Sequence, residues 1–142
     1  SLAQLMERAL EIEPDAGRFR GLLAMCLAAS GGDLERALEL ALDEPRAFMR
    51  ETAQAIIYHH LGDTEKAQER LDVMFRAYDD SASYQYGQIY AQWGDKELAL
   101  TWLNHAQEIR AAGLGMARSD PMMDPLRDDP RFIELIDSLT RF

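Results

Sequence analysis

The fold is decided by three related stretches: GGDLERALELA at residues 31–41, LGDTEKAQERL at 61–71 and WGDKELALTWL at 93–103. Each contains a glycine, then an aspartate and, four residues later, an alanine. Glycine readily takes the left-handed conformation that ends a helix, and aspartate accepts hydrogen bonds from the free N–H groups that begin the next one. The alanine lies one turn into the second helix, where a small side chain lets two helices approach. Each stretch therefore predicts the elbow of an antiparallel helix pair.

The elbows recur at a nearly constant interval. Thirty residues separate Asp33 from Asp63, and 32 separate Asp63 from Asp95. Periods of about 20–50 residues are typical of solenoid proteins, in which stacked helix pairs share a continuous core. The sequence therefore predicts an all-α, superhelical array of antiparallel helix pairs.

Residues around the elbows resemble those of the tetratricopeptide repeat (TPR) family, an α-solenoid built from helix pairs of about 34 residues. The positions that carry this resemblance are Gly32, Asp33 and Ala37 in the first copy, Tyr58, Gly62, Asp63 and Ala67 in the second, and Gly87, Tyr90, Gly94, Asp95 and Ala99 in the third. The first copy departs from the family, because Met25 stands where a small residue is usual. Pro45 should also end its second helix near Asp43.

The resemblance divides the chain into a TPR-like array at 1–111 and an irregular segment with a C-terminal capping helix at 112–142. Within the array we expect a half repeat at 1–15 and repeats at about 16–45, 46–79 and 80–111. Helices are expected near 2–13, 16–30, 34–43, 46–60, 64–78, 81–93, 96–111 and 130–140. Ala9 and Pro14 match the second helix and exit turn of a preceding repeat, so we expect the chain to come from a longer protein. The sequence DPLRDDPRF at residues 124–132 resembles the ends of TPR arrays in bacterial multidomain proteins. This resemblance implies a bacterial regulatory or signalling context.

Composition excludes several other classes of function. The formal net charge is −10 and the pI about 4.7, whereas nucleic-acid binding requires clustered Lys and Arg. No stretch approaches the ~20 apolar residues that a membrane-spanning helix requires. The single cysteine, Cys26, favours a reducing compartment, so we expect a cytoplasmic protein.

No residue pattern indicates catalysis, a cofactor or a metal site. His59 and His60 are adjacent, so on a helix they point about 100° apart and are poorly placed to bind one metal ion. A helical enzyme that uses one of these histidines is a distant alternative. Cys26 is expected to be a buried small side chain.

The acidic residues Asp120, Asp124, Asp128 and Asp129 lack the glycine and closing glutamate of a calcium-binding loop. Helix caps in front of proline explain two of them better. For the neighbouring Met122 and Met123 we expect packing of the tail onto the last helix pair.

The TPR resemblance implies a concave groove, lined by the first helix of each pair, that takes up a peptide or a partner helix. Positions carried over from the family are Leu22, Cys26 and Ala29 in the first repeat, Thr52, Ile56, His59 and His60 in the second, and Tyr84, Gln88 and Gln92 in the third. We therefore expect a non-catalytic protein-protein interaction scaffold that binds a protein or peptide partner. Two alternatives stay open: a groove that is shallow or filled by the chain's own tail, and a self-association module that holds a homodimer through residues 2–13 or the 130–140 helix.

Overall fold

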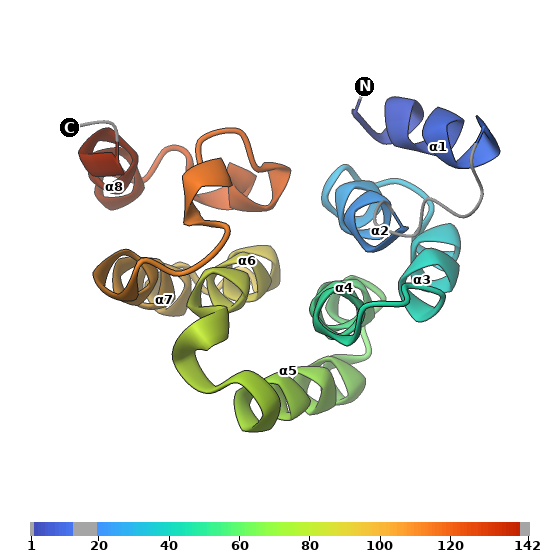
Figure 1. Ribbon diagram of the computed structural model, residues 1–142, viewed down its shortest axis with the longest axis horizontal. Helices are drawn as coiled ribbons and strands as arrows, with labels where there is room; N and C mark the ends of the chain where they lie inside the picture. Colours follow the sequence, from blue (N-terminus) through green and yellow to red (C-terminus); the bar gives the residue numbers. More distant parts are fainter. Residues whose placement is uncertain (1, 13–19, 140–142) are drawn as a thin grey trace. The chain divides into compact units, whose positions relative to one another are not determined.

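The computed structural model describes residues 2–12 and 20–139, and all regular structure in these ranges is helical (Figure 1). The α-helices are α1 (Leu2–Ile12), α2 (Arg20–Ala29), α3 (Leu34–Leu42), α4 (Ala47–His60), α5 (Thr64–Tyr78), α6 (Ser83–Trp93), α7 (Lys96–Ile109) and α8 (Pro130–Leu139). Within these ranges three short 3-10 helices join them, namely η2 (Asp79–Ala82), η3 (Leu114–Met116) and η4 (Pro121–Leu126). The predicted all-α, TPR-like helical repeat architecture is confirmed.

Helix ends agree closely with the sequence-based expectation. α3 stops at Leu42 and is capped by Asp43, as the following Pro45 predicted. α6 begins at Ser83, two residues later than expected, because η2 occupies the start of that segment. The expected start of the second helix at 16–19, the matched Pro14 and the last expected helical residue, Thr140, lie outside the described residues.

The elbows have the predicted chemistry, with one correction. Asp33, Asp63 and Asp95 each accept a hydrogen bond of 3.1 Å from the backbone N–H three residues later. Gly62 and Gly94 have positive φ, but in the first copy the left-handed residue is Gly31 and not Gly32. α2 ends at Ala29, and the N–H of Gly32 bonds to the carbonyl oxygen of Leu27. The first of two adjacent glycines ends the helix, so one more residue separates the left-handed glycine from the capping aspartate here than in the other two elbows.

The chain forms two compact units, residues 1–74 and 75–142. In the first unit α2 packs against α1, α3 and α4. The alanines of its elbows, Ala37 and Ala67, are fully buried. A buried carboxylate joins two helix starts, because Glu44 accepts hydrogen bonds from the backbone N–H groups of Gly21 and Arg46.

The second unit is built on the α6–α7 pair, against which η3, η4 and α8 pack (Figure 1). α6 and α7 approach closely at Gly87, where a Cβ atom would lie 2.7 Å from Cδ2 of Leu103. The core of this unit combines the pair with the C-terminal segment and includes Tyr84, Leu103, Leu114, Ala117, Met123, Leu126, Phe132 and Leu135. The division of the chain at residues 111 and 112 stays a prediction.

Candidate functional site

The predicted groove residues of the first unit lie on α2 and α4 and differ in accessibility. Thr52 and Ile56 are completely buried and Cys26 nearly so. Leu22 and His59 are half-buried, whereas His60 is exposed. A partner can therefore reach Leu22, His59 and His60 without any change in the packing of the unit.

On this face Thr52 is internally bonded, and His59 favours its neutral form. The hydroxyl of Thr52 donates a 2.8 Å hydrogen bond to the carbonyl oxygen of Phe48. Burial, and then the charge of His60, lower the pKa of His59 below its ordinary value. His59 is therefore neutral at pH 7. The two imidazole rings are edge to face with centroids 6.3 Å apart, and within residues 2–12 and 20–139 no three His, Cys, Asp or Glu residues form a candidate metal site.

The predicted groove residues of the second unit contact the chain's own segment 113–126. Tyr84 donates a 2.5 Å hydrogen bond to Oδ2 of Asp120, and Nε2 of Gln88 donates one of 2.8 Å to the same atom. Nε2 of Gln92 donates a 3.0 Å bond to the carbonyl oxygen of Met122. This segment therefore occupies the face of α6 that the resemblance assigned to a ligand.

Asp120 is the centre of these contacts. Its Oδ1 accepts a hydrogen bond from the N–H of Met122, so it also caps η4 in front of Pro121. Burial and the adjacent Asp120 carboxylate raise the pKa of Tyr84, so the phenol stays protonated and serves as a donor. Arg127 holds the segment from outside through bonds to the carbonyl oxygens of Arg118 and Asp120.

Apolar burial anchors the segment in the second unit. Met122, Met123 and Leu126 are fully buried, and burial of each such side chain contributes about 1.5–3 kcal/mol. A peptide that binds along α6 must displace all three. The expected packing of Met122 and Met123 onto the last helix pair is confirmed, as are two aspartate caps, since Asp129 accepts a hydrogen bond from the N–H of Arg131 at the start of α8.

Comparison with known proteins adds one finding to this geometry. Residues 80–112 match the family model of the tetratricopeptide repeat. The matched residues contain α6, α7 and the elbow at Gly94. TPRs generally mediate protein-protein interaction and are typically not catalytic. Neither the comparison with curated proteins nor that with solved structures gives a significant match.

Sequence reasoning missed two roles near the TPR. Asp120 was expected to be a helix cap only, although Tyr84 and Gln88, one turn apart on α6, are suitable donors for one carboxylate. Arg110, which ends α7, has no counterpart in the repeat pattern and lines a pocket described below. No described helix is both long enough and apolar enough to cross a membrane.

The arginines Arg46 and Arg50 at the start of α4 bond within the first unit. Arg46 pairs with Glu44 at 3.2 Å, and Arg50 donates to the carbonyl oxygens of Glu44 and Pro45. These bonds leave both guanidinium groups partly satisfied within the chain.

Proposed function

We propose that this chain is a non-catalytic protein-protein interaction module. The observation that carries the proposal is the TPR at residues 80–112, whose helix pair has the close approach at Gly87 and the capped elbow at Gly94 and Asp95. The first unit repeats the same elbow chemistry at Asp33 and Asp63. We place the module in the cytoplasm, within a larger bacterial regulatory or signalling protein.

Accessibility selects the binding face. In the second unit the side chains of Tyr84 and Gln88 are already bonded to Asp120. On α2 and α4, Leu22, His59 and His60 remain reachable. A neutral or amphipathic peptide or partner helix fits this face, because it offers one aliphatic side chain and a neutral His59.

Site-specific photo-crosslinking tests the proposed face. A photoreactive phenylalanine derivative replaces exposed His60, and a matched variant carries it at exposed Glu69 of α5. In cells, we expect a discrete crosslinked protein from position 60 and none from position 69. Equal crosslinking from both positions, or none from either, would contradict a partner on the α2–α4 face.

Self-association is a second candidate, and exposed apolar residues on α1 favour it. Leu5 is 66% exposed and Ile12 76%, and residues seven apart share one helix face. A second copy that covers this face would form an isologous dimer.

Light scattering across a size-exclusion peak at several concentrations tests this candidate. Self-association predicts that the mass rises from 16.1 kDa toward twice that value, and that Leu5→Glu with Ile12→Glu keeps it at the monomer value. A constant mass near 16.1 kDa for the parent chain would contradict self-association.

A further inference from the structure

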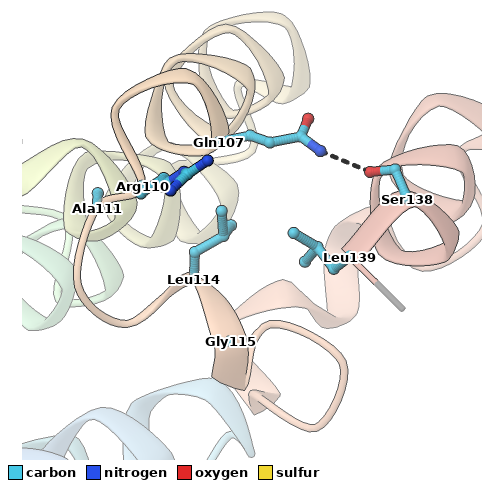
Figure 2. A pocket seen from close by; sticks show the side chains of 7 residues that line it. All are labelled: Gln107, Arg110, Ala111, Leu114, Gly115, Ser138 and Leu139. Atoms are coloured by element: carbon cyan, nitrogen blue, oxygen red, sulfur yellow. Dashed lines mark hydrogen bonds between the residues drawn. The ribbon is translucent and has the colours of Figure 1, made fainter. Parts of the chain in front are cut away.

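A pocket of about 610 Å³ opens in the second unit, where the C-terminal ends of α7 and α8 meet η3 (Figure 2). Ala111, Leu114 and Leu139 supply its apolar surface, and the side chains of Leu114 and Leu139 point toward the same space in Figure 2. On one side Nε2 of Gln107 donates a 2.7 Å hydrogen bond to Oγ of Ser138. The volume is in the usual range of ligand pockets, about 300–1,000 Å³.

Arg110 provides the charge of the pocket. It is exposed, and its guanidinium forms no ion pair with any carboxylate of the residues that the structure describes. Among the described residues that line this pocket, Arg110 is the one with a charged side chain. A ligand with a carboxylate would supply the missing counter-charge.

The backbone of Arg110 gives a second reason to assign it a role. It ends α7 in the left-handed conformation, with φ 55° and ψ 49°. That conformation costs a non-glycine residue roughly 1–2 kcal/mol, and α6 ends on Gly94, which avoids the strain. The interaction of a cation with a helix C-terminus contributes about 0.3–1 kcal/mol. This stabilisation is smaller than the cost of the left-handed conformation. Strain of this kind is typical of functional positions.

We propose that the pocket binds an aliphatic side chain of a partner protein that lies next to an Asp or Glu carboxylate. The aliphatic group enters between Leu114 and Leu139, and the carboxylate pairs with Arg110. The inference rests on the proposed interaction function and adds to it a second contact of defined chemistry, within the second unit.

Two peptide probes that differ by one functional group test the proposal. They are acetyl-Gly-Leu-Asp-Gly-amide and acetyl-Gly-Leu-Asn-Gly-amide, titrated into the ¹⁵N-labelled full chain and followed through the backbone amides of Ala111, Leu114 and Gly115. We expect saturable shifts with both peptides and a dissociation constant about two- to fivefold lower for the Asp peptide, as a partly exposed ion pair provides. No saturable shift, or equal affinities, would overturn the proposal.

Arg110→Gly is the decisive variant, because glycine removes the guanidinium and relieves the backbone strain, so the fold is retained. We expect it to bind both peptides equally. Arg118→Gln, which removes the same charge from an exposed residue outside this pocket, should keep the preference for Asp. Preference retained in Arg110→Gly would exclude Arg110 as the carboxylate partner.

Two further outcomes are informative. Shifts of the same amides on dilution of the protein alone would show that a second copy fills the pocket, and would overturn a foreign partner. The titration is independent of crosslinking at position 60. Arg110-dependent binding without that crosslink would therefore support the pocket and contradict the α2–α4 face.

Discussion

At the scale of single residues, the absence of one methyl group allows α6 and α7 to pack. A Cβ at Gly87 would lie 2.7 Å from Cδ2 and 2.9 Å from Cγ of Leu103. We expect Gly87→Ala to lower the free energy of unfolding by about 1–3 kcal/mol, the usual cost of overpacking. Urea denaturation measures this. Gly115→Ala is the control, because no atom lies within 4 Å of its Cβ position; equal stability of the two variants would contradict the close approach.

The bond between Tyr84 and Asp120 gives a second prediction at this scale. Tyr84→Phe removes one donor from a carboxylate that is 9% exposed, and a hydrogen bond to a charged group contributes about 1.5–3 kcal/mol. We expect the unfolding free energy to fall by that amount. In an Asp120→Ala background the same change should cost much less, since the acceptor is gone. A cost unaffected by Asp120→Ala would show that the phenol acts by another route.

At the scale of elements, Arg131 clamps α8 to α7. Its guanidinium donates to both carboxylate oxygens of Glu97, at 2.8 and 2.9 Å, and to Asp129. Hydrogen bonds from Arg131 hold the pKa of Asp129 at about 2, below its ordinary 3.8, and the same guanidinium lowers the pKa of Glu97. Because both pKa values are depressed in the folded chain, the clamp stabilises α8 above about pH 4 and is lost as the pH falls toward 2.

The lowered pKa values of Asp129 and Glu97 give a third prediction. Arg131→Gln should lower the urea midpoint at pH 6, where both carboxylates are ionised. The difference between the parent chain and the variant should shrink between pH 4 and pH 2, because protonation disrupts the clamp in the parent chain. A difference as large at pH 2 as at pH 6 would show that Arg131 acts through packing and not through the ion pairs.

Glu44 links the starts of α2 and α4 and gives a fourth prediction. Its side chain is fully buried and accepts bonds from two backbone N–H groups and from Arg46. We expect Glu44→Gln to cost about 1.5–3 kcal/mol of unfolding free energy. Glu35→Gln, on the exposed side of α3, should cost under about 0.5 kcal/mol. Similar losses of unfolding free energy in both variants would contradict the claim that Glu44 links the starts of α2 and α4.

Sequence predicted the elements better than their contacts. The Gly-Asp elbows and the proline after Asp43 predicted helix ends because caps and breakers act over a few residues. The assignment of Gly32 as the residue that ends the helix was wrong, because two adjacent glycines tolerate the left-handed conformation equally and Gly31 adopts it. The contact of Asp120 with Tyr84 joins residues 36 apart. No local pattern reports a contact between residues so far apart in the sequence. The 3-10 helix η4 has 6 residues, too few for a periodic pattern to predict it.

At the scale of the whole molecule, the charge balance governs stability more than any single ion pair. With a net charge of −10, the excess carboxylates repel one another in the compact state. Exposed ion pairs contribute only about 0–1 kcal/mol each. We therefore expect the melting temperature at pH 7 to rise as NaCl increases from 10 to about 150 mM, where screening shortens the Debye length to ~8 Å. A melting temperature that falls with added salt would mean that the ion pairs dominate.

The segment 113–126 over α6 also competes with any foreign peptide for this face of the helix. A ligand on the same chain as its receptor has an effective concentration of order millimolar, and it is present in every molecule. Asp120 with the two buried methionines is such a ligand for Tyr84, Gln88 and Gln92. A foreign peptide that made only the same contacts would lose this competition at cellular concentrations. A partner that displaced this segment from α6 would therefore need additional contacts elsewhere on the chain.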